Sequence, residues 1–333
     1  MVSEEPPFLN ASKAWILLRC HRRWRLESDV SSESRMWDLG VVMDTNIGTI
    51  AHKAIEEWVD SGAWKAGNAG DLLARLFEGK APTDPTSIGH VRRLSALLAF
   101  RAQALVTVLA ESSKKPGTEV SLQDDSRRVR GQLDLVTYTE QQVHVVDVKT
   151  GAGLGAANAL PLSVECQMAI YAFLAAGEWH AEVQLSVFST ESGFRALPME
   201  LVEATSRVDQ LISERTVASA SKPDAHASAD VCTWCHFRDD CDAHWSAVDA
   251  GSITDAVSGW VIHVSDSDAG IGSVVFESSS GTQVLSGVSR SLAESVAVGQ
   301  FVMFFRVRRD PRGNSDLWHA TRKTGMKVRM DRG

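Results

Sequence analysis

RVRGQLDLVTYTEQQVHVVDVKT, residues 128–150, is the stretch of the chain that decides the fold. Apolar and polar residues alternate along both of its halves, with a polar segment between them. This period-two pattern is typical of β-strands that bury one face. The stretch therefore predicts two antiparallel strands, over 128–138 and 143–149, that form a hairpin. The face that we expect to be buried carries Leu133, Leu135, Val146 and Val148.

The register of this hairpin brings charged side chains together. A turn centred between Glu140 and Gln141 places residue i opposite residue 281 − i, so Asp134 lies opposite Asp147. Side chains paired in this way are about 5 Å apart, and two like charges there are destabilising unless something compensates them. Lys149 lies on the same face as Asp147. A hard cation such as Mg²⁺ is one compensator, and an exposed Asp–Lys pair without a metal is the other interpretation.

The rest of the first 250 residues supplies the elements around this hairpin. Apolar residues at helical spacing predict helices over 11–27, 46–60, 90–112, 164–177 and 199–217. Further strands are expected over 119–124 and 182–189. Asn46 is the expected N-cap of the second helix. The order of helices, β-β-β-α-β and a last helix indicates an α/β fold, with a mixed α+β sheet entered through antiparallel strands.

From about residue 250 the chain changes to short strands rich in Ser, Gly and Val. Five strands, with a short helical segment over 291–299 between the third and the fourth, predict a small OB-fold-like β-barrel. Other small β-barrels give a similar pattern. We therefore expect two domains, one over 1–248 and a barrel domain over 249–333.

Residues of the first domain match the motifs of a nuclease family. In chain order, the motifs G-x-x-x-H, G-x-x-D, D-x-K and Q-x-x-x-Y are formed by Gly48 and His52, Gly131 and Asp134, Asp147 and Lys149, and Gln167 and Tyr171. Over residues 12–243 the chain thus resembles the PD-(D/E)xK nuclease superfamily and, more narrowly, the RecB/AddB-like exonuclease branch. The resemblance implies a restriction-endonuclease-like core and leaves the C-terminal barrel outside.

The resemblance also implies roles for single residues. Mg²⁺ or Mn²⁺ would be held by His52, Asp134, Asp147 and the carbonyl of Val148. Lys149 would position the attacking water and offset the charge that develops on the scissile phosphate. Gln167 and Tyr171 would contact the DNA strand. Glu119, at the start of a strand, is a further candidate for holding metal or orienting water, and a solvated acid is its alternative interpretation.

Three of the five cysteines lie close together as C-x2-C-x5-C, at Cys232, Cys235 and Cys241. A tetrahedral metal site and a cubane cluster both need a fourth ligand. The candidates are Cys20, Cys166, His236 and His244. In the iron–sulfur members of the branch that the chain resembles, one N-terminal cysteine and a C-x2-C-x5-C segment hold a [4Fe–4S] cluster. The resemblance therefore implies Cys20 as the fourth ligand, and zinc is the alternative to the cluster.

The charge of the chain is uneven. A net charge of −8 argues mildly against nucleic acid as a partner. Residues 13–25, however, contain five Lys and Arg and no acid, and residues 301–333 contain nine Lys and Arg against three Asp. The candidate DNA contacts in these segments and in the barrel are Arg22, Arg23, Arg306, Arg308, Trp260 and Phe304. Solvated charged faces are the alternative for each segment.

The sequence also bears on the cellular location of the protein and on whether the chain can drive a helicase itself. The first residues show no apolar leader, no stretch approaches the length of a membrane span, and an odd number of cysteines is not typical of a secreted disulfide framework. We therefore expect a cytoplasmic protein without a membrane partner. The chain also has no GxxxxGK[ST] phosphate loop, so a helicase motor would have to be another chain.

These observations favour a Mg²⁺- or Mn²⁺-dependent deoxyribonuclease. We expect a single-strand-specific exonuclease that acts in DNA repair, recombination or defence, with a helicase or another repair or defence protein as a candidate partner. The alternative is a nuclease-fold DNA-binding subunit of a helicase–nuclease complex, without activity of its own. Retention of Asp134, Asp147 and Lys149 together argues against that alternative.

Overall fold

The computed structural model describes residues 5–29, 42–83, 88–150, 160–219, 223–233, 235–265, 271–321 and 324–329. It divides into two compact units. The first unit contains residues 1–18 and 42–221, and the second contains residues 19–41 and 222–333. The predicted domain boundary at residue 248 stays a prediction, because these units group the cysteine-rich segment with the C-terminal strands.

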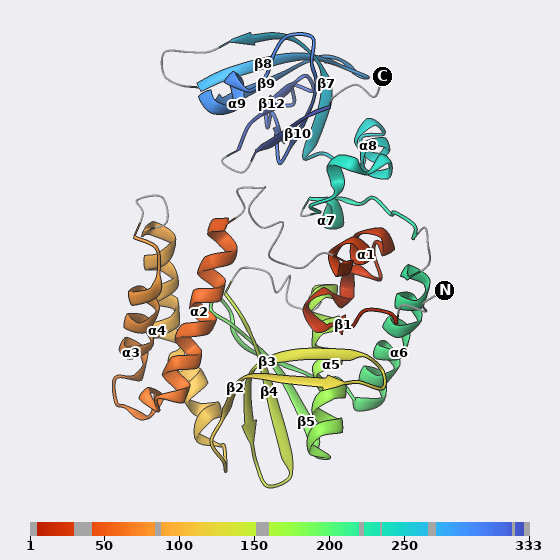
Figure 1. Ribbon diagram of the computed structural model, residues 1–333. Coiled ribbons are helices and arrows are strands. Elements are labelled where there is room, and N and C mark those ends of the chain that lie inside the picture. The colour runs from red at the N-terminus through yellow and green to blue at the C-terminus, as the bar shows by residue number, and fades with distance from the viewer. Residues whose placement is uncertain are drawn as a thin grey trace. The chain divides into compact units, whose positions relative to one another are not determined.

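The first unit holds a six-stranded mixed sheet with helices on both faces (Figure 1). Its strands are β1 (Leu9–Asn10), β2 (Gly117–Asp124), β3 (Val129–Tyr138), β4 (Gln142–Lys149), β5 (Glu182–Ser189) and β6 (Gly193–Leu197). Its helices are α2 (Val42–Asp60), α3 (Ala69–Lys80), α4 (Ile88–Ala110), α5 (Leu162–Trp179) and α6 (Leu201–Ala218), with 3-10 turns at Ala11–Ile16 and Ala63–Lys65. The predicted β-β-β-α-β order is confirmed: α5 connects β4 to the parallel strand β5.

The buried face of the hairpin packs against α2, α3 and α4. Leu135 of β3 and Val146 and Val148 of β4 lie in one apolar cluster with Phe188 of β5 and the inner faces of these three helices. None of the four side chains is more than 1% exposed. The alternation read from the sequence therefore assigns this face correctly, and α5 and α6 cover the other face of the sheet (Figure 1).

Helix α4 contradicts the expectation that no stretch of the chain approaches the length of a membrane span. With 23 residues, it is long and apolar enough to cross a membrane by length and composition alone. Its buried residues, among them Leu98, Leu105 and Leu109, lie in the same apolar cluster as the hairpin. A buried core helix of a globular unit meets the same length and composition criterion.

Strand β3 is paired along most of one edge and along a smaller part of the other. β2 runs antiparallel to it from Val129 to Val136. On the opposite edge, β1 pairs with Val129–Arg130 and β4 pairs with Leu135–Tyr138. The four pairs with β4, such as Leu135 with Val146, follow the predicted register. In this described part of the chain, β3 has no strand partner on that edge between Arg130 and Leu135.

The predicted single helix over 11–27 is wrong, because the helical structure is interrupted in the middle of this range. A 3-10 turn ends at Ile16, and helix α1 (His21–Asp29) starts anew in the second unit. Cys20 caps α1: its Sγ lies 3.5 Å from the backbone N of Arg23, which donates to it. Helical spacing continues across the break, so periodicity alone cannot show it. Helix α2 likewise begins at Val42, so Asn46 is not its N-cap.

The second unit combines short helices with a seven-stranded sheet. Its strands are β7 (Ala256–Ser265), β8 (Ile271–Ser278), β9 (Gly281–Ser289), β10 (Phe301–Phe305), β11 (Arg308–Arg309), β12 (Leu317–His319) and β13 (Gly325–Arg329). Its other helices are α7 (Ala229–Cys232), α8 (Asp242–Asp249) and α9 (Arg290–Glu294), with a 3-10 turn at Arg238–Asp240. The helix expected between the third and fourth strands is confirmed as α9.

The pairing of this sheet does not confirm a closed barrel. Among the described residues the strands follow one another in the open order β11-β12-β9-β8-β7-β10-β13. Phe304, a candidate DNA contact, is fully buried in the core of the sheet, because its side chain points to the face that packs on Phe276. Trp260 is 46% exposed.

The cysteine-rich segment packs on this sheet within the second unit. Lys327 of β13 forms ion pairs with Asp239 and Asp240, with N–O distances of 2.8 and 2.9 Å. The guanidinium of Arg238 lies 4.4 Å from the ring centre of Phe305. Cys232 shares an apolar cluster with Phe305 and its neighbours. These contacts explain why the segment groups with the C-terminal strands.

We predict that Gly131→Ala destabilises the first unit. A Cβ at Gly131 would lie 2.9 Å from Cε1 of Tyr171, whose buried ring has no room to move. Overpacking of this kind costs about 1–3 kcal/mol of unfolding free energy, which chemical denaturation measures. Gly79→Ala is the matched control, because its added Cβ would meet no atom within 4 Å beyond its chain neighbours and the backbone of its own helix. Equal stabilities of the two variants would contradict the account of β3 and α5.

Candidate active site

Three neighbouring strands place one carboxylate each at the same level of the sheet. In β2 and β3, the pairs Thr118–Leu135 and Val120–Leu133 flank Glu119 and Asp134, which therefore lie opposite each other. The register of β3 and β4, continued by one pair, places Asp134 opposite Asp147. Glu119 has φ of 49°, in the left-handed region that non-glycine residues rarely adopt. Such strain is concentrated at functional sites.

Helix α2 brings His52 to these carboxylates. Its Nδ1 lies 3.4 Å from Asp134 Oδ1 and 3.8 Å from Glu119 Oε1. Glycine at position 48, one turn earlier, allows the close approach, because a Cβ there would lie 3.1 Å from Oγ1 of Thr150. His52, Glu119 and Asp134 are the one group of described residues with three or more ligand atoms within 4.8 Å of one another.

Asp147 and Lys149 form the second half of the site. Asp147 is fully buried, and its Oδ1 accepts a hydrogen bond of 3.1 Å from Lys149 Nζ. Its Oδ2 lies 2.9 Å from the same Nζ as an ion pair but accepts no hydrogen bond. Asp134 Oδ2 accepts a 2.7 Å bond from the backbone N–H of Val148.

A chain of hydrogen bonds fixes the position of Lys149. Its Nζ donates to Gln167 Oε1 at 3.0 Å, and Gln167 Nε2 donates to the Tyr171 hydroxyl at 2.7 Å. The hydroxyl donates to the carbonyl of Gln132, in the stretch of β3 that pairs with β2 but has no described strand partner on its other edge. Gln167 lines the cleft described below, and its DNA contact stays a prediction. Tyr171 is 2% exposed and also lines that cleft, and its predicted contact with DNA stays a prediction.

Burial and neighbouring charges raise the pKa values of both His52 and Asp147. Burial lowers the pKa of His52, but hydrogen bonds and charge interactions with Asp134 and Glu119 outweigh it and raise that pKa to about 10. Burial raises the pKa of Asp147 to about 7, against the opposing charge of Lys149. The carboxylates thus hold a proton on His52 and crowd one another, which are properties of a cation site.

The donor set fits Mg²⁺ or Mn²⁺. His52, Glu119 and Asp134 offer converging ligand atoms, and Asp147 adds a buried carboxylate that is paired with the Lys149 ammonium. Carboxylates suit both ions, and an imidazole makes Mn²⁺ more acceptable than an all-oxygen site would. Glu119, which its strand position alone left ambiguous, belongs to the group. The carbonyl of Val148 stays a predicted ligand.

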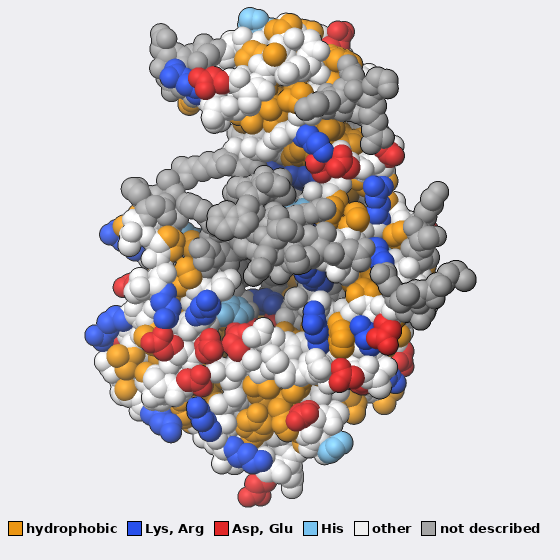
Figure 2. All heavy atoms as spheres, in the orientation of Figure 1, with side chains coloured by type: hydrophobic (Ala, Val, Ile, Leu, Met, Phe, Trp, Pro, Cys, Tyr) orange, Lys and Arg blue, Asp and Glu red, His pale blue; other side chains and the backbone are white. Residues whose placement is uncertain are grey.

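A cleft of about 570 Å³ opens at this site. Glu119, Asp134 and Gln167 line one end of it, and Lys13 and Arg130 line it too. Figure 2 shows acidic side chains gathered beside a histidine on this face of the first unit. Sequence reasoning missed Arg130. The available signal was its place on β3, four residues before Asp134 and on the same face.

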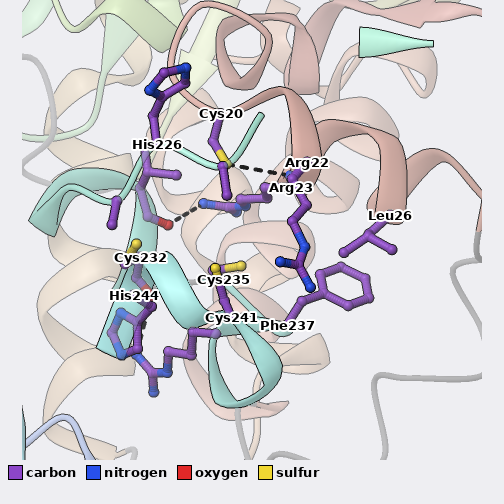
Figure 3. A pocket seen from close by; sticks show the side chains of 14 residues that line it. Cys20, Arg22, Arg23, Leu26, His226, Cys232, Cys235, Phe237, Cys241 and His244 are labelled. Atoms are coloured by element: carbon purple, nitrogen blue, oxygen red, sulfur yellow. Dashed lines mark hydrogen bonds between the residues drawn. The ribbon is translucent and has the colours of Figure 1, made fainter. Parts of the chain in front are cut away.

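The cysteines form a second candidate site, in the second unit. Cys20, Cys232, Cys235 and Cys241 line one pocket, together with Arg23 and His244 (Figure 3). All five cysteines are free thiols. Burial raises the pKa of Cys235 to about 11 and also raises that of Cys232. Cys166 lies apart, buried in α5 of the first unit, and His236 is not among the residues that line the pocket.

The predicted basic DNA contacts have different surroundings. Arg23 is buried and is used inside the second unit, where it donates to Glu27 Oε1 at 2.7 Å and to the carbonyl of Val231 at 2.6 Å. These bonds engage its guanidinium inside the second unit, and its DNA contact stays a prediction. Arg22 donates to the backbone of Asp240. Arg306 is half-buried and Arg308 is exposed, so DNA contacts by Arg22, Arg306 and Arg308 stay predictions.

We predict that Mn²⁺ binding releases protons. His52 must be neutral to bind a metal, yet its pKa of about 10 keeps it protonated at neutral pH in the metal-free site. Affinity for Mn²⁺ should therefore rise as the pH rises toward that value. Calorimetric titration in two buffers of different ionisation enthalpy counts the released protons.

His144 provides the matched control for this titration. It lies on β4, and burial lowers its pKa, so it is neutral before and after metal binding. His52→Gln should reduce the proton release, and His144→Gln should leave it unchanged. Heats that do not depend on the buffer, with an affinity that does not change with pH, would contradict the assignment of His52.

No curated protein matches the chain. Three solved structures are similar at low level: a candidate exonuclease from Eubacterium rectale (10% identity, 68% of this chain and 89% of that one, TM-score 0.39), SSO0001 (15%, 73% and 89%, 0.33) and the tetrameric p202 HIN2 (16%, 23% and 43%, 0.21). The chain thus spans less than half of the last of these. Similarities this distant carry no argument about function.

The family comparison is of a different kind. The family model of the PD-(D/E)XK nuclease superfamily matches residues 9–242, more than half of the chain. The matched range contains the three carboxylates, Lys149 and His52, and it ends after the third cysteine of the C-x2-C-x5-C segment. The chain belongs to the PD-(D/E)XK nuclease superfamily.

Proposed function

We propose that this protein is a metal-dependent deoxyribonuclease of the RecB/AddB-like branch that degrades single-stranded DNA as an exonuclease. The observation that carries the proposal is the grouping of His52, Glu119 and Asp134 with the ion pair of Asp147 and Lys149, beside a cleft that Glu119 and Asp134 line. We further propose that it acts in the cytoplasm, in DNA repair, recombination or defence.

The residues divide the work of phosphodiester hydrolysis. Mg²⁺ or Mn²⁺, held by His52, Glu119, Asp134 and Asp147, supplies Lewis-acid stabilisation of the phosphate and activation of water when bound. Lys149 carries a positive charge whose position is fixed by Asp147 and Gln167. Its ammonium offsets negative charge that develops on the phosphate oxygens, and prior orientation makes this effective.

Gln167 and Tyr171 act through Lys149. Tyr171 is anchored to β3 by its hydroxyl and orients the amide of Gln167, which then presents its oxygen to Nζ. Because Lys149 is 30% exposed, this support prevents it from turning into solvent. Gln167 and Tyr171 are therefore positioning residues in this proposal.

The C-terminal sheet supports a preference for single strands. β7, β8 and β9 form an antiparallel meander, β10 returns antiparallel to β7, and β12 runs parallel to β9, with α9 between β9 and β10. This connectivity is that expected of an OB-fold-like module, a fold that binds single strands on exposed aromatic and basic side chains. Trp260 and Arg308 are exposed on it.

A complex with a helicase is part of the proposal. The chain lacks a phosphate loop, so strand separation would come from a partner. A non-catalytic DNA-binding subunit is the competing assignment. The ion pair of Asp147 and Lys149 speaks against it, because both side chains are retained with their supporting hydrogen bonds.

We also propose that the four-cysteine pocket holds a [4Fe–4S] cluster. Four thiolates on one zinc ion, at Zn–S distances of about 2.3 Å, would lie within about 4 Å of one another. No three Sγ atoms of these described cysteines all lie within 4.8 Å of one another. A cubane, which gives each cysteine its own iron, accommodates wider spacing. Cys20 would then tie α1 to the segment that carries Cys232, Cys235 and Cys241, 212 and more positions along the chain.

We expect end-labelled single-stranded DNA to be degraded with Mg²⁺ or Mn²⁺ and not in EDTA. Asp147→Asn and Lys149→Met should each lower the rate about 100-fold or more. Asp125→Asn, a change at an exposed carboxylate in the β2–β3 turn, is the control and should have no effect. Strands blocked at either end report whether cleavage starts from an end. Equal rates in wild type and Asp147→Asn would refute the site.

We expect Cys20→Ser to lose iron. After anaerobic purification, the wild-type chain should contain iron and acid-labile sulfide, and the variant should contain neither and become sensitive to protease. Cys166→Ser is the control, because Cys166 is buried outside the pocket, and it should keep both. A wild-type chain that carries zinc, or a Cys20→Ser variant that keeps its iron, would contradict the cluster assignment.

A further inference from the structure

Three arginines lie at the start of β3, and two of them are neutralised by carboxylates. Arg127 forms an ion pair of 2.6 Å with Asp209, and Arg128 forms one with Glu5. Arg130 differs. Its Nε donates to the side-chain oxygen of Asn10, and no described carboxylate forms an ion pair with it. Arg130 therefore carries an uncompensated positive charge on the surface of the cleft.

The guanidinium of Arg130 is held in place, but only part of its hydrogen-bonding capacity is occupied. Its carbon lies 5.4 Å from the ring centre of Phe8, and the bond to Asn10 occupies only Nε. Among the described residues, nothing accepts a hydrogen bond from its two terminal nitrogens. A planar fork with free terminal N–H groups is suited to bind a phosphate through two parallel hydrogen bonds.

β2 and β3 form a ladder of paired side chains that connects Arg130 to the candidate metal site. The first pair is Glu119 with Asp134, at the metal end. The next pair is Ser121 with Gln132, both neutral and polar. The last is Gln123 with Arg130. All six residues line the same cleft. The floor of the cleft thus changes from acidic through neutral to basic along one line.

The length of this ladder suits a strand of nucleic acid. Arg130 and Asp134 are four residues apart on one strand face, which corresponds to about 13 Å. Successive phosphates of an extended strand are closer together than this, so a strand with one phosphate at the carboxylates brings another within reach of a long arginine side chain. The cation and the arginine would then bind two different phosphates of the same strand.

We propose that Arg130 is a second phosphate-binding site, which holds a phosphate that flanks the scissile one. The proposal rests on the proposed nuclease function and deepens it. It identifies the substrate as an oligonucleotide strand laid along β2 and β3. A compound with a single phosphodiester cannot contact Arg130 and the metal site at the same time, so it lacks the binding energy of the second contact. Arg130 touches the substrate away from the reacting atoms, so it determines binding and register.

The test compares wild type, Arg130→Gln, Arg130→Lys and the control Arg127→Gln. Binding of a fluorescent single-stranded oligonucleotide is measured in EDTA at several salt concentrations. Arg130→Gln should bind about tenfold more weakly, and the slope of log Kd against log[salt] should fall by about 0.7, the value for one lost phosphate contact on a single strand. Arg130→Lys should keep the slope, and Arg127→Gln should behave as wild type.

Cleavage with Mn²⁺ locates the phosphate. Oligonucleotides that carry one neutral methylphosphonate at successive positions should show one flanking position at which wild-type KM rises about tenfold and kcat is unchanged. Arg130→Gln should be insensitive at that position. Hydrolysis of bis(p-nitrophenyl) phosphate, with its single diester, should be equal in wild type and Arg130→Gln.

The outcomes separate the two claims. Equal salt slopes in wild type and Arg130→Gln would overturn the second phosphate site, whatever the cleavage results are. If the slope of log Kd against log[salt] falls by about 0.7 in Arg130→Gln, but the wild-type protein cleaves neither substrate, the phosphate site is supported and the nuclease assignment is refuted. A lower rate of bis(p-nitrophenyl) phosphate hydrolysis in Arg130→Gln would also overturn the proposal, because it would show an effect on the reacting centre.

Discussion

The hydrogen bond from the backbone N–H of Val148 to the carboxylate of Asp134 determines the local structure on which the site depends. Regular pairing between β3 and β4 stops at Leu135 and Val146, and beyond it a side chain takes the place of a backbone acceptor. The two strands separate there without leaving the amide of Val148 unpaired, which a buried position would make costly. Asp147 and Lys149 follow directly on the separating strand.

The open edge of β3 is then filled from α5. The hydroxyl of Tyr171 bonds the free carbonyl of Gln132, and its ring packs where a side chain at Gly131 would otherwise be. Through Gln167 the same tyrosine fixes Lys149. A residue of the G-x-x-D motif and two of the Q-x-x-x-Y motif are thus parts of one packing arrangement, with the reactive groups at its edge.

Much of this site could be predicted from the sequence, because period-two alternation and the hairpin register are local properties. They gave the register of the four pairs between β3 and β4, which end one position before Asp134 and Asp147, and the face that packs on α2, α3 and α4. The break at Cys20 could not be predicted in this way, because apolar spacing continues across it. The use of Arg23 inside the second unit depends on Val231, 208 positions away, and no local pattern reports it. The net charge of the chain was equally uninformative about Arg130. Contacts between distant residues decide which arginines form ion pairs with carboxylates and which keep an uncompensated charge.

The most direct measurement is the location of Mn²⁺ by anomalous diffraction from crystals soaked in that ion. The account predicts a peak within bonding distance of His52 Nδ1 and of carboxylate oxygens of Asp134 and Asp147, with Lys149 still held by Gln167. A peak elsewhere, or a chain that binds no Mn²⁺ while the Val148–Asp134 hydrogen bond is intact, would contradict it.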